Sequence, residues 1–267
     1  RLEVVLAATG KEITLIPNTG TNRQVTVFPD SFRRSRLYLP GNNPKFFINA
    51  GLYQSDGIIF DLEDSVAAGK KEEARVLVRN AIIAGDYNSS EIMVRINPLP
   101  LGLTDLEFVI PYGVDTILVP KCESAGNIQT IEEKIKKIQK KHGLDKPVYL
   151  MPIIESALGV INSYEIASAS ANVVARNMLV NAAKAAKIQA IDSVFSNVSD
   201  MDALFNTARQ AKYMGFDGMG CIHPRQIEVI HKAFAPTDNE IEKAKKIILA
   251  FNKAEAEGKS VVSLNNK

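Results

Sequence analysis

The stretch Gly57–Asp64, GIIFDLED, combines a short apolar run with three acids at its end. The apolar residues stand next to one another and do not alternate with polar ones. This pattern is typical of a parallel strand that is buried on both faces. We therefore predict a buried strand over Gly57–Asp61, with Asp61, Glu63 and Asp64 at its carboxyl end.

Seven further runs of this kind occur along the chain, and stretches with helical spacing separate them. The other predicted strands are Arg36–Pro40, Ile92–Ile96, Thr116–Pro120, Val148–Ile154, Asn172–Ala175, Ile188–Phe195 and Gly218–Ile222. The clearest helical stretches are Lys70–Gly85, Asn127–Gly143 and Asp200–Gly215. Eight strands that alternate with helices predict an α/β fold, namely a (β/α)8 TIM-like barrel. In such a barrel the active site lies at the carboxyl ends of the strands, so polar residues that end a run are candidate site residues.

The barrel is predicted to span residues 31–236, with residues 1–30 as an N-terminal extension. After Asn172–Ala175 the chain passes directly into the helix-favouring stretch Ala175–Lys187, without the turn residues found at other strand-to-helix connections. We therefore expect that a loop is missing from the sequence after Ala175. Residues 237–267 are predicted as a C-terminal helical extension, with a helix at Asn239–Glu257 and an incomplete tail.

The composition of the 267 residues, 46% of them hydrophobic, is that of a globular protein. The 32 Lys and Arg residues nearly balance the 30 Asp and Glu residues, which argues against a nucleic-acid-binding protein. No run of about 18 apolar residues occurs, so no membrane span is expected. Two cysteines are too few for a disulfide framework, and we expect a cytoplasmic protein. The chain has neither a GxGxxG nor a GxxxxGKS/T motif, so the usual sequence argument for dinucleotide or NTP binding does not apply.

Glu155 follows the apolar run Val148–Ile154 and is expected to point into the mouth of the barrel. An isolated carboxylate there is costly unless it is paired or binds a cation. The sequence lacks the His-x-His, Cys-x-x-Cys and His-Glu-x-x-His spacings of zinc and iron sites. A hard cation such as Mg²⁺, which uses one or two carboxylates together with water and substrate, fits better. A structural ion pair is the alternative role for Glu155.

Arg95 lies inside an apolar run, a position suited to binding a substrate carboxylate or to stabilising a developing oxyanion. A salt bridge to a nearby acid such as Glu63 is the alternative. Glu63 and Asp64 are candidates for binding metal-bound water or for transferring protons. The alternative role of these acids is to cap the following helix and to pair with Lys70 and Lys71.

A basic cluster, RRSR at Arg33–Arg36, precedes the first predicted strand, and Lys45 lies in the loop that follows it. Such a patch is suited to binding a phosphate group. A solvated rim without a ligand is the alternative.

Seven motifs, in order along the chain, carry a resemblance to a known family. They are RRSRLYLPGNNPKF, GIIFDLEDSV, MVRINP, LVPKCES, MPIIESALGV, NMLVNAAKAAKIQAIDSVFSN and GFDGMGCIHPRQI. Together they resemble the HpcH/HpaI aldolase superfamily, in particular its citrate lyase beta subunits, over residues 33–267. Malyl-CoA and citramalyl-CoA lyases share most of these motifs.

The resemblance implies a modified TIM barrel, usually trimeric, that cleaves a β-hydroxy acyl thioester. For the citrate lyase members, a citryl thioester on an acyl carrier protein or CoA gives oxaloacetate and an acetyl thioester, in a complex with alpha and gamma subunits. It also implies that Glu155 binds Mg²⁺ and that Arg95 binds the oxaloacetate portion of the substrate. Glu63 and Asp64 would shape the water shell of the metal, and Arg36 and Lys45 would bind the phosphates of the CoA-like arm.

In the family, a second metal-binding acid lies in the loop that we expect to be missing after Ala175. The resemblance therefore leaves three functions open. The first is a Mg²⁺-dependent citryl thioester lyase. The second is a malyl-CoA or citramalyl-CoA lyase, and the third is a non-catalytic subunit that docks an acyl carrier protein.

Overall fold

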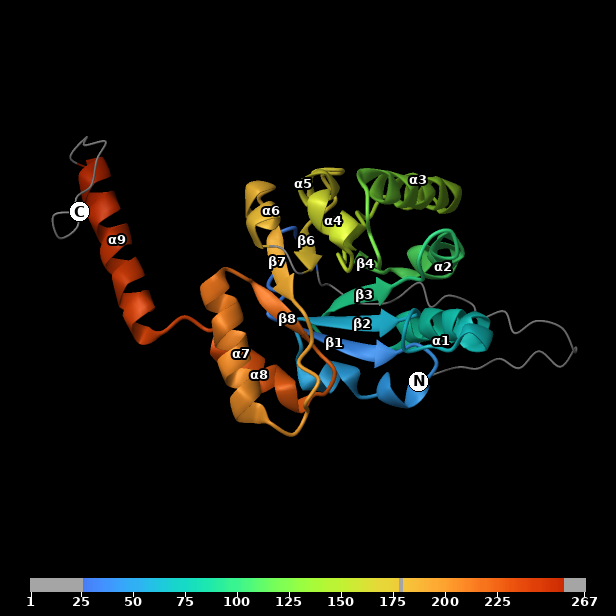
Figure 1. Ribbon diagram of the computed structural model, residues 1–267, viewed down its shortest axis with the longest axis horizontal. Helices are drawn as coiled ribbons and strands as arrows, with labels where there is room; N and C mark the ends of the chain where they lie inside the picture. The colour runs from blue at the N-terminus through green and yellow to red at the C-terminus, as the bar shows by residue number, and fades with distance from the viewer. Residues whose placement is uncertain (1–25, 178–179, 257–267) are drawn as a thin grey trace, which may run out of the picture. The chain divides into compact units, whose positions relative to one another are not determined.

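The computed structural model describes residues 26–177 and 180–256. The chain divides into two compact units, Arg1–Ala233 and Phe234–Lys267. All the described strands belong to the first unit, with helices around them (Figure 1). In the second unit the structure describes one helix, α9 (Asp238–Ala256). A site at the carboxyl ends of the strands therefore belongs to the first unit.

The strands form one eight-stranded parallel sheet in the order β5-β4-β3-β2-β1-β8-β7-β6. They are β1 (Ser35–Pro40), β2 (Gly57–Asp61), β3 (Glu91–Arg95), β4 (Thr116–Val119), β5 (Tyr149–Pro152), β6 (Ala175–Asn177), β7 (Gln189–Asp192) and β8 (Gly218–Cys221). The two outer strands of this order approach each other where Leu150 of β5 forms a parallel bridge with Val173, just before β6. The sheet is therefore curled, which is consistent with a TIM-like barrel, and the carboxyl ends of its strands point in one direction.

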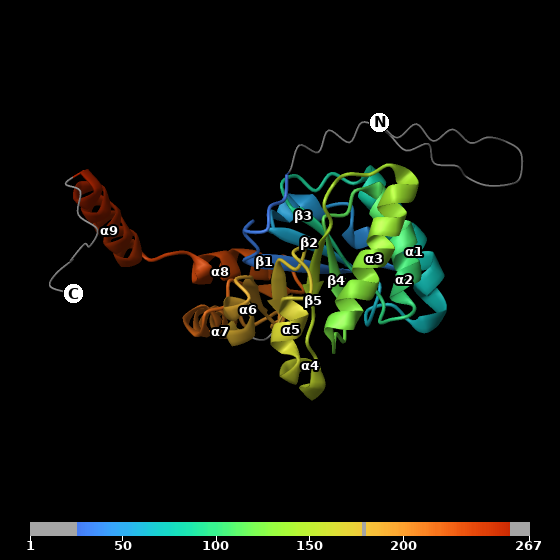
Figure 2. The same cartoon turned by 90° about the horizontal axis from the view of Figure 1, so that it is seen from above.

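The helices of the first unit lie outside the curled sheet (Figures 1 and 2). They are α1 (Lys71–Ala84), α2 (Gly102–Val109), α3 (Ala125–His142), α4 (Ala157–Ile161), α5 (Ser163–Ala167), α6 (Val180–Ala185), α7 (Met201–Met214) and α8 (Arg225–Phe234). In α3, Ile128, Ile131, Ile135 and Ile138 recur at helical spacing and are buried. The helix ends at Gly143, whose φ of 63° is the left-handed conformation that favours glycine. The apolar spacing and the glycine therefore define this helix, as the sequence predicts.

The prediction was wrong around the sixth strand. The predicted strand Asn172–Ala175 overlaps β6 only at Ala175, and the helix favoured over Ala175–Lys187 begins only at Val180. The residues of β6 pair with Gln189–Ile191 of β7. Hydrogen bonding to the neighbouring strand therefore overrides the helix propensity of this stretch.

Several predictions concern residues that the structure does not describe. Residues 1–25 and 257–267, which make up most of the predicted N-terminal extension and the predicted tail, lie outside the described residues. The same holds for residues 178–179, close to the expected missing loop. The helix predicted at Asn239–Glu257 corresponds to α9, which begins one residue earlier. Among the described helices, none has both the length and the apolar character needed to cross a membrane.

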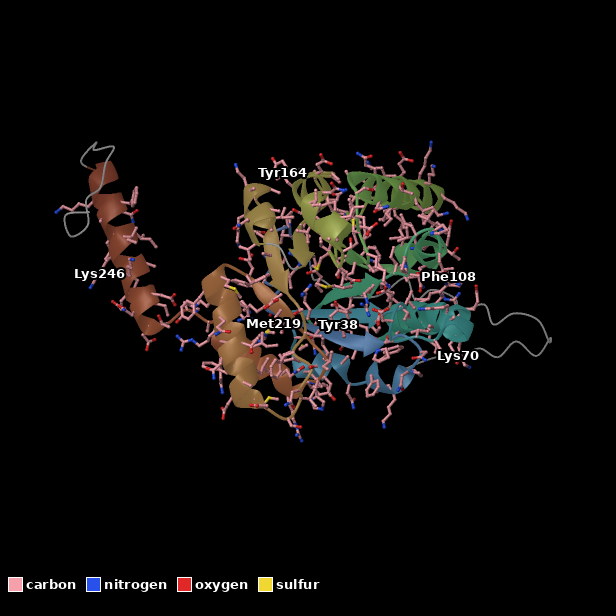
Figure 3. The ribbon with its side chains drawn as sticks, viewed as in Figure 1. Tyr38, Lys70, Phe108, Tyr164, Met219 and Lys246 are labelled. Carbon is pink, nitrogen blue, oxygen red and sulfur yellow. The ribbon has the colours of Figure 1, made fainter. Side chains whose placement is uncertain are left out.

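An apolar cluster fills the interior of the sheet below the carboxyl ends of the strands. Its buried members are Ile59, Met93, Leu118, Met151, Ile153 and Ile191. Tyr38 of β1 packs against this interior apolar cluster, and Figure 3 shows it among the strands, whereas Phe108 lies on α2 at the outside. Because the cluster occupies the middle of the sheet, space for a ligand remains only at its ends.

A buried ion pair joins α1 to α2. Nε of Arg75 lies 2.6 Å from Oδ1 of Asp105, and the two side chains are 2% and 0% exposed. The other carboxylate oxygen of Asp105 accepts hydrogen bonds from the backbone N and side-chain Nδ2 of Asn97, at 2.6 and 2.8 Å. Asp105 thus connects two outer helices to the chain that leaves β3. Asn97, one of the polar residues at a strand end, has a structural role here.

We predict that Asp105→Ala destabilises the protein by about 3–5 kcal/mol, because it leaves the buried Arg75 charge with only the exposed Glu72 as a partner. Urea denaturation measures this change, with Glu73→Ala as the control, since Glu73 is 53% exposed in its pair with Lys70. The control should leave the midpoint essentially unchanged. Equal midpoints for the two variants would show that the buried pair does not stabilise the fold.

Candidate active site

A cavity of about 540 Å³ lies at the carboxyl ends of the strands. Its walls include Tyr38, Asp61, Asp64, Arg95, Glu155 and Asp192. Ligand sites typically occupy roughly 300–1,000 Å³, so the cavity has room for a small organic acid and part of a larger substrate. The structure thus brings together Arg95, Asp64 and Glu155, which the sequence predicts as site residues from three different strand ends.

Arg95 and Asp61 form a two-pronged salt bridge in this cavity. Nε and Nη2 of Arg95 donate to Oδ1 and Oδ2 of Asp61, each at 2.7 Å. Burial alone would lower the pKa of Arg95, but the hydrogen bonds and charge of Asp61 outweigh it and raise that pKa. Burial alone would raise the pKa of Asp61, but the hydrogen bonds and charge of Arg95 outweigh this effect and hold that pKa below its ordinary value. The guanidinium is therefore charged and held in one orientation.

The remaining acids of GIIFDLED complete a network around Arg95. Nη1 of Arg95 lies 3.0 Å from Oε2 of Glu63 and 3.4 Å from Oδ2 of Asp64. Nζ of Lys121 lies 2.5 Å from Oε1 of Glu63 and 3.6 Å from Oδ1 of Asp64. The salt bridge between Arg95 and Glu63, predicted as an alternative, is thus present. Of the five N–H groups of the Arg95 guanidinium, one on Nη2 is not used by this network.

Pairing of these acids with Lys70 and Lys71, the alternative interpretation, was wrong. Nζ of Lys70 pairs instead with Glu73 at 2.7 Å. Nζ of Lys71 donates to the backbone carbonyls of Leu62 and Glu63, at 2.7 and 2.5 Å. The lysine at the end of β4 takes the place expected for these two, because the strand order puts it next to β3.

Like Asp192, Glu155 lines the cavity but is not neutralised by this network. Its side chain is exposed and lines the cavity, and among the described residues it forms no salt bridge and no hydrogen bond. Partial burial raises the pKa of Glu155, and the charge of Glu63 adds to this effect, whereas Arg95 and Lys121 oppose it. The structural ion pair, the alternative role predicted for Glu155, is absent from the described part of the chain.

The acids at the cavity outnumber the bases. Five carboxylates stand against three cations here, with Asp61, Glu63, Asp64, Glu155 and Asp192 against Arg36, Arg95 and Lys121. A cation at Glu155 would compensate the excess negative charge. Within residues 26–177 and 180–256, no three acidic, histidine or cysteine side chains are grouped for metal binding. The residues present therefore fit Mg²⁺, which takes one or two protein carboxylates and fills its other positions with water and substrate oxygens.

The structure places Arg36 and Lys45 in different surroundings. Arg36 is 1% exposed and lines the floor of the cavity. Lys45 is exposed in the short 3₁₀ turn Pro44–Phe46 after β1 and is not part of the cavity wall. The structure therefore does not bring the two residues together in this cavity, and their role in binding phosphates stays a prediction.

The sequence analysis missed Tyr38 as a site residue. The Cζ atom of Arg95 lies 5.3 Å from the centre of the Tyr38 ring, so the ring supports the guanidinium. Arg36, Tyr38 and Pro40 all line the cavity and stand at every second position of RLYLP. Alternate residues of a strand point to the same face, so this spacing could have identified Tyr38.

Gly220 of β8 keeps the cavity open next to Tyr38. A Cβ atom at this position would lie 2.8 Å from Cγ1 of Val194 and 3.2 Å from Cε2 of Tyr38. Any side chain at Gly220 would therefore displace one of these neighbours or fill the cavity.

Comparison with known proteins shows which family the chain belongs to. Residues 34–175 and 171–224 match the HpcH/HpaI aldolase/citrate lyase family. The chain belongs to this family. Within it, the citrate lyase subunit beta of Haemophilus influenzae is 39% identical, over 88% of this chain and 91% of that protein. The corresponding subunit of Leuconostoc mesenteroides is 37% identical, over 89% of this chain and 88% of that protein.

The family similarity extends to other activities and to solved structures. The mitochondrial citramalyl-CoA lyase of Rattus norvegicus is 31% identical, over 85% of this chain and 78% of that protein. A citrate lyase beta subunit from Mycobacterium tuberculosis, complexed with oxaloacetate and magnesium, superposes with a TM-score of 0.64 at 26% identity. That match covers 78% of this chain and 99% of the other.

We predict that Asp61→Asn destabilises the protein at pH 7 by about 1–3 kcal/mol, because Arg95 loses a charged acceptor. The pKa of Asp61 in the folded protein lies below its ordinary value of 3.8, so its stabilising effect is present above pH 3.8. The effect is lost as the pH falls through the folded pKa, since folded and unfolded chains then bind the same proton. Thermal unfolding of both proteins from pH 7 down to about pH 2 measures this. A difference that stays constant over this range contradicts the prediction.

Proposed function

We propose that the protein is a Mg²⁺-dependent carbon–carbon lyase that cleaves a citryl thioester into oxaloacetate and an acetyl thioester. This proposal rests on one observation, namely that Arg95 and the unneutralised Glu155 line the same cavity. The two citrate lyase beta subunits at 37% and 39% identity support the choice of substrate. The structural relative complexed with oxaloacetate and magnesium supports the choice of metal.

Glu155 would hold the metal, with substrate and water oxygens as the other ligands. Bound Mg²⁺ would lower the cost of negative charge on the substrate hydroxyl as that group becomes the ketone of oxaloacetate. Glu155 is suited to this role because no described side chain competes for its oxygens. Glu63 and Asp64 would act indirectly, since their salt bridges hold Arg95 and Lys121 at the cavity and orient the water around Glu155.

Arg95 would bind the carboxylate next to the reacting carbon. Its Nη2 has one N–H that Asp61 does not use, and Asp64, which is 64% exposed, accepts only at 3.4 Å. A substrate carboxylate can therefore bind there without breaking the short contacts to Asp61. Because those contacts fix the guanidinium before the substrate arrives, little reorganisation is needed when negative charge develops.

The acetyl thioester arm would leave through the open side of the cavity. We propose that the arm is carried by an acyl carrier protein or by CoA, and that Lys45 binds its phosphates. We also propose that three copies of the chain assemble with alpha and gamma subunits. We propose a cytoplasmic location, which the two free cysteines support. In the family, a second metal-binding acid would come from a loop after Ala175. The family model matches this chain in two parts that meet at residues 171–175, which supports the proposal that this loop is missing from the sequence.

A citramalyl-CoA or malyl-CoA lyase is the second candidate, favoured by the 31% identity with citramalyl-CoA lyase. The two candidates differ in the acid released, which is oxaloacetate in the first case and pyruvate or glyoxylate in the second. A non-catalytic subunit that docks an acyl carrier protein is the third. It becomes preferable when purified protein binds the carrier but cleaves none of the three thioesters.

The direct test is incubation of the full chain with citryl-CoA and Mg²⁺, with oxaloacetate measured through a coupled dehydrogenase. We expect release of oxaloacetate that EDTA abolishes and added Mg²⁺ restores. Release that is insensitive to EDTA, or cleavage of citramalyl-CoA alone, would falsify the proposal.

We further predict that Arg95→Ala and Glu155→Gln each lower kcat on the order of 10²–10³-fold, the typical effect of removing one group that stabilises developing charge. Glu133→Gln is the matched control, because Glu133 is exposed on α3 and does not line the cavity. Circular dichroism should show that all three variants fold. Full activity in Glu155→Gln would assign the metal to another carboxylate.

A further inference from the structure

Arg36 is a buried cation with almost no hydrogen-bond partners. Its Nη1 donates to Sδ of Met151 at 2.8 Å, and its Nε and Nη2 are buried without a hydrogen bond. A thioether sulfur is a weak, uncharged acceptor. The guanidinium can donate five hydrogen bonds, so most of its capacity is unused.

Glu91, the acid whose charge acts on Arg36, is already paired with another arginine. Arg33 is also 1% exposed, and its Nε and Nη2 lie 2.7 and 3.1 Å from the two carboxylate oxygens of Glu91. Thr116 also donates a hydrogen bond to Glu91. Burial lowers the pKa of Arg36 to about 10, so the side chain is still protonated at pH 7. Among the described residues, Arg36 therefore has a buried positive charge without an acid of its own.

The strands on both sides of Arg36 leave space around it. The register pairs Arg36 with Gly57 of β2 and with Gly220 of β8. A Cβ atom at Gly57 would lie 3.4 Å from Cγ of Arg36 and 2.7 Å from Cε of Met93. Glycine on both neighbouring strands thus leaves room for a large cation inside the sheet.

Arg36 belongs to the same cavity as Arg95 and Glu155, but it lies deeper. It stands two residues before Tyr38 on β1, and both line the cavity. Two residues of a strand span about 6.6 Å, so Arg36 starts below the ring that supports Arg95. A compact ligand with an anionic group at each end would contact Arg95 near the mouth and Arg36 at the floor.

We propose that Arg36 is a specificity-determining residue, which binds the second carboxylate of a dicarboxylic oxo acid released by this enzyme. The inference rests on the proposed function and specifies its substrate class. Oxaloacetate has one carboxylate directly next to its ketone, which Arg95 and the metal would bind. Its second carboxylate is separated from the ketone by one CH₂ group, and Arg36 would bind it. Pyruvate and glyoxylate lack the second carboxylate, so binding them leaves the buried charge uncompensated. A planar carboxylate matches the fork of a guanidinium, which Arg36 otherwise leaves unused.

Binding measurements test this assignment without requiring turnover. Isothermal titration with Mg²⁺ present compares oxaloacetate with pyruvate for wild type, Arg36→Met and Arg79→Met. The last is the matched control, because Arg79 lies on α1 and is not part of the cavity wall. We expect wild type and the control to prefer oxaloacetate by about 10²–10³-fold, the usual effect of a buried charge pair, and Arg36→Met to lose this preference. No preference in wild type, or a preference kept by Arg36→Met, overturns the assignment.

Thermal unfolding separates this role from a structural one. Methionine has a similar length without the charge, so Arg36→Met should unfold at the same temperature as wild type or higher, because an unpaired buried charge is removed. A lower melting temperature combined with an unchanged preference for oxaloacetate would assign Arg36 to the fold and overturn the proposal.

Kinetics separate this inference from the proposed function. In wild type, kcat/KM for citryl-CoA should exceed that for citramalyl-CoA, and Arg36→Met should remove the difference mainly by raising KM for citryl-CoA. If wild type cleaves no thioester, the proposed function fails. The loss of oxaloacetate preference in Arg36→Met would then still support Arg36 as a dicarboxylate-binding residue.

Discussion

The salt bridge between Arg95 and Asp61 organises the carboxyl ends of the strands. Backbone pairing of β2 with β3 sets these two residues opposite each other, so their side chains leave the sheet on the same face. The pair is partly buried, which strengthens the attraction between its charges and fixes both groups. Glu63 and Lys121 then assemble around the fixed guanidinium. Without this pair, the acids of GIIFDLED would repel one another at the mouth of the cavity.

One consequence is an uneven distribution of charge within the cavity. Asp61 and Glu63 are neutralised by neighbouring bases, whereas Glu155, which lines the same cavity, forms no salt bridge with the described residues. A site that has to bind a cation needs such a carboxylate, because an acid already held by arginine or lysine would first have to give up that partner. The same salt bridges that stabilise the strand ends therefore leave Glu155 available for chemistry.

The interior of the sheet combines apolar side chains with the cation Arg36, which has no acidic partner among the described residues. Most inward-facing positions carry the interior apolar cluster, as expected for the core of a barrel. Arg36 departs from this pattern, and the glycines beside it make the departure sterically possible. A buried charge that lacks an acidic partner among the described residues reduces stability, which is the reason for our proposal that Arg36 binds an anion.

The amino-acid sequence alone was enough to predict the succession of strands and helices and most of the charged residues that line the cavity. The uninterrupted apolar runs and the polar residues at their ends were sufficient, because burial on both faces and the common direction of parallel strands leave few other arrangements. Local propensity misplaced the sixth strand, where pairing with β7 decides the structure. Only the tertiary structure decided which charges are paired. Arg95 and Glu63 could be partners or independent groups in the sequence, and Arg36 and Lys45 looked equivalent. Distances across strands and the depth of each side chain below the surface separate these roles, and neither quantity is encoded at one position of the chain.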